Sequence, residues 1–236
     1  MDLPTLAQNF APEDYAALAV LLLAWLGVTP LIENAPASRP STAQLVARYR
    51  RAWMVQFITR EPRIFDSQIV GNLRQGTAFF ASACMIAIGG GFALLGNAER
   101  IRGVAQDLTQ NADPIIVWEA KLLVILMIAT NAFLKFVWAH RLFGYCAVLM
   151  AAVPNDPNDP EALPLATKAG EINVLAARSY NRGLRSVYFG IAAAVWLAGA
   201  WALMAAALFT LGVVARREFA SQSRAVLLSD GTRTGS

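Results

Sequence analysis

Residues 115–134 read IIVWEAKLLVILMIATNAFL, a run of twenty residues in which Glu119 and Lys121 are the charged ones. A helix rises about 1.5 Å per residue, so this run covers the ~30 Å hydrocarbon core of a bilayer. Backbone polar groups inside that core must be satisfied within the segment. The run therefore predicts a transmembrane helix. Its apolar character continues to Met150, so we expect the helix to extend beyond the bilayer.

Three more apolar stretches, at residues 15–32, 73–96 and 187–215, complete the pattern. Hydrophobic residues make up 56% of the chain and charged residues 15%, against about 25% charged in soluble domains. We therefore expect an all-α, polytopic membrane protein: a four-transmembrane-helix bundle that forms a single membrane domain over residues 1–236. No Lys or Arg precedes the first stretch, unlike in a signal peptide, so we expect it to remain as an anchor.

Lysine and arginine concentrate in two of the three connections, and such residues are retained in the cytoplasm. The first connection, residues 33–72, holds six arginines, and the third, residues 151–186, holds one lysine and three arginines. The second, residues 97–114, holds two. This favours an N-terminus outside and the first and third connections in the cytoplasm. Four spans place the flexible tail, residues 216–236, outside as well, although Arg216 and Arg217 follow the last span.

Both cytoplasmic connections carry amphipathic helical patterns. Ser41 and Gln44 form a capping box, which predicts a helix up to Glu61-Pro62. A turn-forming run at residues 154–160 precedes a second pattern, from Leu165 to Tyr180. We expect these segments to form a helical cap that lies on lipid or on itself. A shorter pattern, residues 101–108, suggests a helix lying flat on the outer interface.

Polar residues on a membrane helix are the first candidates for a site, because burying them is costly. Lys121 can snorkel to the nearby outer boundary. The other candidates on the third span and its extension are Glu119, Asn131, Lys135, Trp138 and Arg141. They could anchor the helix, bind an anionic lipid headgroup or line a transport pathway.

A second candidate group begins the fourth span: Asn181, Arg182, Arg185 and Tyr188. The guanidinium group of arginine can bind a phosphate or carboxylate through two parallel hydrogen bonds, and tyrosine is favoured at a membrane interface. The alternatives are a positively charged anchor with an aromatic belt, or a buried ion pair with Asp66 or Glu171 that holds the cap together.

Other classes of function lack their signatures. His140 is the only histidine and lies beside no nucleophile or metal-ligand pattern, and Cys84 and Cys146 lack metal-site spacing. We expect no enzyme, no metal and no cofactor. The net charge of +4 comes from arginines beside the spans, so we expect no nucleic-acid partner. The alanines at 194, 198, 202 and 206 suit close helix packing within the chain more than a dimer contact.

Several motifs together resemble one family. They are Asn181-Arg182-Gly183-Leu184-Arg185 with Tyr188-Phe189; Ile64, Asp66, Gln68 and Asn72; Phe79-Phe80-Ala81-Ser82; and Phe133, Lys135, Phe136, Trp138, Arg141 and Tyr145. The chain thereby resembles the bacterial membrane proteins grouped as domain of unknown function 599, although Gly144 stands where that pattern has asparagine. The resemblance implies a four-span inner-membrane protein and implies no biochemical activity.

We expect a non-enzymatic accessory or scaffold protein that binds lipid or a membrane complex. Its partners would be the bilayer, anionic lipid headgroups, another membrane protein or further copies of the chain. The alternative is a small solute or ion transporter or channel in which Glu119, Asn131 and Lys135 face an internal cavity.

Overall fold

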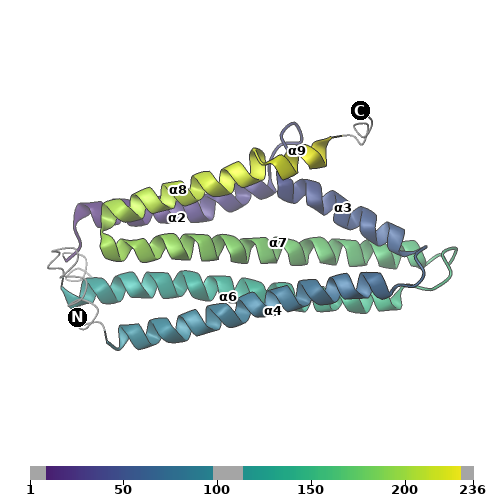
Figure 1. Cartoon of the computed structure of the whole chain (residues 1–236), viewed down its shortest axis with the longest axis horizontal. Helices are drawn as coiled ribbons and strands as arrows, with labels where there is room; N and C mark the ends of the chain where they lie inside the picture. Colours follow the sequence, from purple (N-terminus) through teal and green to yellow (C-terminus); the bar gives the residue numbers. More distant parts are fainter. Residues whose placement is uncertain (1–8, 98–113, 230–236) are drawn as a thin grey trace.

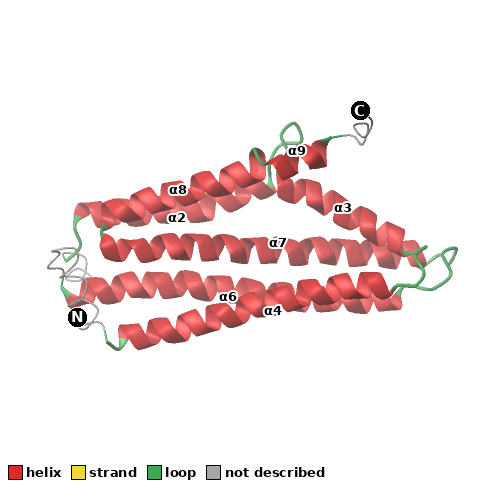
Figure 2. Cartoon of the chain, in the orientation of Figure 1, coloured by secondary structure: helices red, strands yellow, loops and turns green. Residues whose placement is uncertain are grey.

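The computed structural model describes residues 9–97 and 114–229, and these residues form helices and loops without a strand (Figure 2). In chain order the elements are α2 (Pro12–Glu33), α3 (Thr42–Phe57), α4 (Ile64–Leu95), α6 (Ile115–Ala152), α7 (Ala162–Ala194), the 3-10 helix η1 (Val195–Ala198), α8 (Ala200–Phe219) and α9 (Gln222–Leu228). The expected outer-interface helix at residues 101–108 lies outside the described residues, and so does Asp113, which precedes the third span.

The long helices run side by side in an elongated bundle (Figure 1). Four of them, α2, α4, α6 and the α8–α9 segment, are long and apolar enough to cross a membrane. This confirms the predicted all-α polytopic fold. One end of the bundle holds the start of α2, the end of α4 and the start of α6, and we call it the α2-start end (Figure 1).

Helix length divides the bundle into two zones. With 22 and 20 residues, α2 and α8 are about 33 and 30 Å long, which matches the hydrocarbon core. The helices α4, α6 and α7 have 32, 38 and 33 residues, which gives about 48–57 Å. They therefore extend well past the ends of α2 and α8, and α3 lies across their extended part (Figure 1). We call α3 with these extensions the cap.

The cap helices follow the sequence signals. Ser41 accepts a hydrogen bond from the backbone N–H of Gln44, and the Gln44 side chain accepts one from the N–H of Ser41, so the predicted capping box is present. Helix α4 begins at Ile64 and continues without a break through the second apolar stretch. Helix α6 likewise runs unbroken from Ile115 to Ala152, as expected.

The predicted fourth span, residues 187–215, is wrong, because the chain reverses within it. Helix α7 runs unbroken from the cap to Ala194, and after η1 the backbone turns at Gly199, where φ is +128°. Helix α8 then returns alongside α2 (Figure 1). The hydropathy of the sequence misses this reversal because both arms of the hairpin are apolar.

The reversal changes the account of the C-terminal part. Residues 216–219 belong to α8 and residues 222–228 form α9, so the predicted flexible tail is wrong for these residues. The end of α8, with Arg216 and Arg217, lies near the start of α3 rather than at the α2-start end (Figure 1). The basic residues in the last turn of α8 therefore lie on the same side of the molecule as the basic connections. The alanines at 194 and 198 precede the turn, whereas those at 202 and 206 follow it, so they do not form one stripe.

Each of the two zones has an apolar cluster in its interior. In the membrane zone, Leu21, Ile128, Phe189 and Leu203 are at most 1% exposed and belong to one cluster formed by α2, α6, α7 and α8. In the cap, residues of α3, α6 and α7 form another, which includes Met54, Phe57, Cys146, Met150 and Ala166. The cap segments therefore pack on one another.

Candidate functional site

One polar cluster lies in the interior of the bundle near the α2-start end. The Lys121 ammonium lies 3.7 Å from Asp14 Oδ1, and the indole N–H of Trp196 donates a 2.6 Å hydrogen bond to the same oxygen. Lys121 is 2% exposed and also lies over the Trp118 and Trp196 rings, 5.9 and 5.7 Å from their centroids. The prediction that Lys121 snorkels to the boundary is wrong, because a carboxylate inside the bundle holds it.

A second cluster lies where α2 ends, and we call it the Glu33 cluster: Glu33, Arg182, Arg185 and Thr29. Arg182 donates two hydrogen bonds to the Glu33 carboxylate, at 2.8 and 2.5 Å. Arg185 donates to Glu33 Oε1 at 2.9 Å and to Thr29 Oγ1 at 3.2 Å. The side chain of Arg185 is only 5% exposed. One carboxylate of α2 therefore binds two arginines of α7.

Sequence reasoning selected both arginines but missed Glu33. The alternative in which Asp66 or Glu171 binds these arginines does not hold, because Asp66 pairs with Arg60 and Glu171 pairs with Arg51. Asp66 is 0% exposed and binds Arg60 at 2.5 Å, and it accepts a 2.6 Å hydrogen bond from the Trp53 indole. The available signal for Glu33 was an acidic residue at the boundary of the first span, on the side where arginines accumulate.

The other expected partner, Glu171, lies on the cap surface. It forms a two-point pair with Arg51 of α3, at 2.5 and 3.0 Å. This hydrogen bonding lowers the pKa of Glu171 and raises the pKa of Arg51. The two side chains are 50% and 44% exposed, so solvent screens the pair and it stabilises the cap only weakly.

Asn131 contacts Ser186, which follows Arg185 of the Glu33 cluster in the sequence. The Ser186 hydroxyl lies 3.2 Å from Asn131 Oδ1 and accepts a 3.1 Å hydrogen bond from the indole N–H of Trp25. Asn131 thus links α6 to α7 in the bundle interior. It lies ten positions along α6 from Lys121, which is about 15 Å along the helix. Leu21, Ile128 and Phe189 belong to the apolar cluster of this membrane zone and are at most 1% exposed.

The other predicted residues of α6 lie apart from one another. Glu119 and Lys135 are half-buried, sixteen residues apart in the sequence, which is about 24 Å along the helix. Trp138 is 49% exposed, and the Arg141 guanidinium lies 6.0 Å from its ring centroid and donates to the Tyr145 hydroxyl at 2.9 Å. The structure therefore does not bring Glu119, Asn131 and Lys135 together at one cavity.

A cavity of about 270 Å³ lies between α3 and α7, beside the Glu33 cluster. The two helices are in close contact further along, where a Cβ on Gly170 would meet Met54 Cβ at 3.4 Å. They diverge toward the start of α3 (Figure 1). The residues that line the cavity are Glu33, Thr42, Ala43, Gln44, Val46, Ala47, Arg50, Val174, Ala177, Arg178, Asn181 and Glu218. The volume is just below the ~300–1,000 Å³ range of small-molecule sites.

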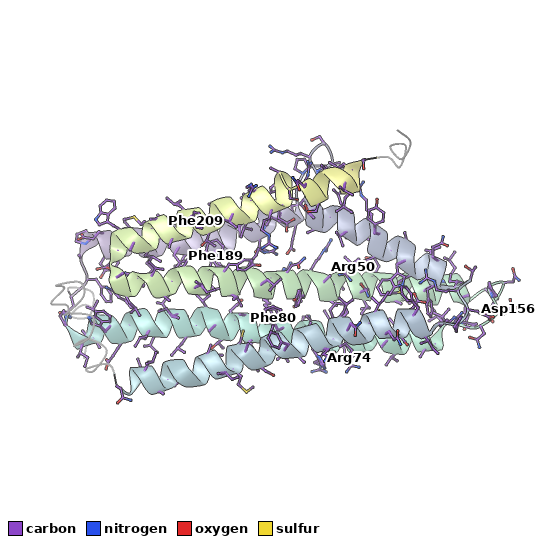
Figure 3. The ribbon with its side chains drawn as sticks, in the orientation of Figure 1. Arg50, Arg74, Phe80, Asp156, Phe189 and Phe209 are labelled. Carbon is purple, nitrogen blue, oxygen red and sulfur yellow. The ribbon has the colours of Figure 1, made fainter. Side chains whose placement is uncertain are left out.

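Arg50 gives this cavity its charge on the α3 side (Figure 3). Its Nη1 donates a 2.6 Å hydrogen bond to Asn173 Oδ1, while its buried Nε has no partner within the described residues. Burial lowers the pKa of Arg50. Arg178 and Asn181 line the α7 side. Donors and positive charge that the fold does not fully satisfy suit an anionic group.

A second cavity of about 210 Å³ adjoins the first, and both are lined by Thr42, Asn181 and Glu218. The Glu218 carboxylate accepts a 3.0 Å hydrogen bond from the backbone N–H of Ala43. The other lining residues of the second cavity are Leu184, Arg185, Tyr188, Val214, Arg217, Ser221 and Ser223. Three of the predicted residues, Asn181, Arg185 and Tyr188, thus meet there with Arg217, which was not among the predicted site residues.

Comparison with known proteins identifies a family. A family model described as "Protein of unknown function, DUF599" matches residues 16–223. No curated protein and no solved structure matches the chain.

Proposed function

This chain belongs to the DUF599 family of proteins of unknown function, and we propose that it is a non-enzymatic accessory or scaffold protein of the bacterial inner membrane. In this proposal the bundle anchors the chain, and the cap binds lipid or a membrane complex in the cytoplasm.

The observation that carries the proposal is the way in which α7 joins the two zones. It is one unbroken helix of 33 residues, about 50 Å long, and it lies in both the cap and the membrane zone. The Glu33 cluster fixes it to α2 at the level where α2 ends. A cap held in this way has a fixed distance and orientation relative to the bilayer, as a binding platform requires.

The surface of the cap supports a binding role. Tyr49, Phe65, Val148 and Leu163 are 54–68% exposed although they lie beyond the ends of α2 and α8. Large apolar side chains that remain exposed in a watery zone are candidates for contact with a partner.

We further propose the orientation of the chain. Helices α2, α4, α6 and α8 would each cross the bilayer, and the outer half of α7 together with η1 would make a fifth crossing, one more than the four expected from the sequence. The start of α2 would lie outside and the cap in the cytoplasm. This arrangement places both arginine-rich connections and Arg216 and Arg217 on the cytoplasmic side, in agreement with the positive-inside rule.

One observation favours a second candidate, a small transporter or channel. Lys121 and Asp14 form a buried pair in the membrane zone, and such pairs occur on ion and proton pathways. Conduction would require Leu21, Ile128 and Phe189 to separate, because they are packed in the interior of this zone.

Purification of the full chain in mild detergent, with and without the double substitution Tyr49→Ser and Leu163→Ser, tests the scaffold. We expect wild-type protein to retain a stoichiometric partner that the variant loses, with equal thermal stability. As a control, Leu208→Ser changes a side chain that is 56% exposed in the membrane zone, and it should keep the partner. Recovery of the chain alone, together with saturable solute uptake into liposomes that Lys121→Met abolishes, would support the transporter instead.

A further inference from the structure

A third depression, about 180 Å³ in volume, lies between α7 and α8 on the outer surface of the bundle. Its lining is mainly apolar: Tyr188, Ile191, Phe209, Thr210, Val213, Val214 and Arg217. Ile191 is 64% exposed and Phe209, labelled in Figure 3, is 74% exposed. We call this depression the α7–α8 groove.

The groove continues into the second polar cavity, because Tyr188, Val214 and Arg217 line both. Arg217 lies two residues before the end of α8. Phe209 and Val213 lie eight and four residues earlier, about 12 and 6 Å further into the membrane zone. The polar cavity is therefore at the level of the headgroups, and the groove is at the level of the acyl chains.

The polar cavities carry an excess of positive charge. Their walls hold Arg50, Arg178, Arg185 and Arg217 against two glutamates, Glu33 and Glu218. Glu33 is already bound by Arg182 and Arg185. In the second cavity this leaves Arg217 beside Glu218, whose carboxylate accepts a hydrogen bond from the Ala43 N–H, so Arg217 is the cation that an anion would contact.

Arg217 is held at the junction of groove and cavity. It donates a 2.9 Å hydrogen bond to the Tyr188 hydroxyl, and its guanidinium lies 5.8 Å from the Tyr188 ring centroid. Asn181, Ser221 and Ser223 line the same cavity and add amide and hydroxyl groups. A phosphate there could accept from a fixed guanidinium and from neutral donors together.

We infer that the second cavity and the α7–α8 groove form one site for an anionic phospholipid. The phosphate lies against Arg217 in the cavity, and one acyl chain lies along Ile191, Phe209 and Val213. The inference rests on the proposed function, since it names the lipid that the scaffold binds. A soluble phosphate would use the cavity alone, whereas the apolar groove at the correct depth favours a lipid.

Native mass spectrometry of the full chain, titrated in detergent with phosphatidylglycerol, tests the site. We expect one tightly held lipid. Arg217→Gln should weaken its binding about tenfold, because it removes a charge-assisted contact with the phosphate. Ile191→Trp should weaken it comparably by filling the groove while it leaves every charge in place.

Arg216→Gln is the matched control, because it removes the same charge from the adjacent residue, which lines neither the cavity nor the groove. Its affinity for phosphatidylglycerol should equal that of the wild type, and all three variants should unfold at the same temperature in lipid-free detergent. Equal losses in Arg216→Gln and Arg217→Gln would mean general surface attraction and overturn the inference. Equal binding of phosphatidylcholine would overturn it as well, and so would full competition by inorganic phosphate.

The scaffold is tested separately by the cap substitutions at Tyr49 and Leu163. Loss of lipid specificity with retention of the cap partner would refute the lipid site alone. If no partner were retained, or if the cap substitutions did not release it, while specific lipid binding stayed intact, the cap would be refuted as a protein-binding platform.

Discussion

At the scale of single residues, Glu33 is the carboxylate on which the junction of α2 and α7 depends. Glu33→Gln would leave Arg185, whose side chain is 5% exposed, without its counter-charge. Removing one partner of a buried pair is strongly destabilising, so we expect a loss of about 3 kcal/mol in the free energy of unfolding. Unfolding of the purified protein in a single detergent measures it.

The matched substitution is Glu171→Gln, which also breaks a two-point pair with arginine. Both side chains of the Arg51–Glu171 pair are about half exposed, and surface pairs contribute about 0.2–1 kcal/mol to stability. We expect a change of about 0.5 kcal/mol at most. Equal effects of the two substitutions would show that burial of Arg185 is not what gives Glu33 its importance.

At the scale of elements, the contact between α6 and α7 depends on Gly183. A Cβ at this position would lie 2.8 Å from Cε1 of Phe136, which is 0% exposed and stacked on Phe80 with ring centroids 5.3 Å apart. Gly183→Ala should therefore destabilise the protein by about 1–3 kcal/mol. Gly144→Ala on α6, where nothing lies within 4 Å of the new Cβ, should be neutral or stabilising. The unfolding temperatures of the two variants compare them directly.

The reversal between α7 and α8 depends on Gly199. Its φ of +128° and ψ of +163° lie in a region that is almost restricted to glycine. We expect Gly199→Ala to cost about 1–3 kcal/mol, measured by thermal unfolding. Gly212→Ala lies within α8 and has nothing within 4 Å, so it should not destabilise. A Gly199→Ala protein of wild-type stability would contradict the turn.

At the scale of the whole molecule, the hairpin fixes which parts of the chain share a compartment. We predict that Asp156, labelled in the loop between α6 and α7 in Figure 3, and Ser229 lie on the same side of the membrane. Asn9 should lie on the opposite side. Single cysteines at these positions, in a background without Cys84 and Cys146, can be labelled with a membrane-impermeant thiol reagent. Equal labelling of Asn9→Cys and Ser229→Cys in intact cells would contradict this topology.

Local signals in the sequence were enough for much of the fold. Apolar length predicted α2, α4 and α6, because a bilayer requires about twenty apolar residues from each spanning helix. The capping box predicted the start of α3, since its hydrogen bonds lie within four residues of each other. Motifs along the chain were also enough to identify the family.

The tertiary structure decided what depends on residues far apart in the chain. A single glycine turns one apolar stretch into two antiparallel helices, and hydropathy does not change at such a turn. Arg185 lies 152 positions from Glu33, and the 180 Å³ groove exists only because α8 folds back on α7. The sequence by itself determined that the chain forms membrane helices and where α2, α4 and α6 lie, because that follows from local composition. Which charges pair, and where a lipid can lie, depended on how those helices pack.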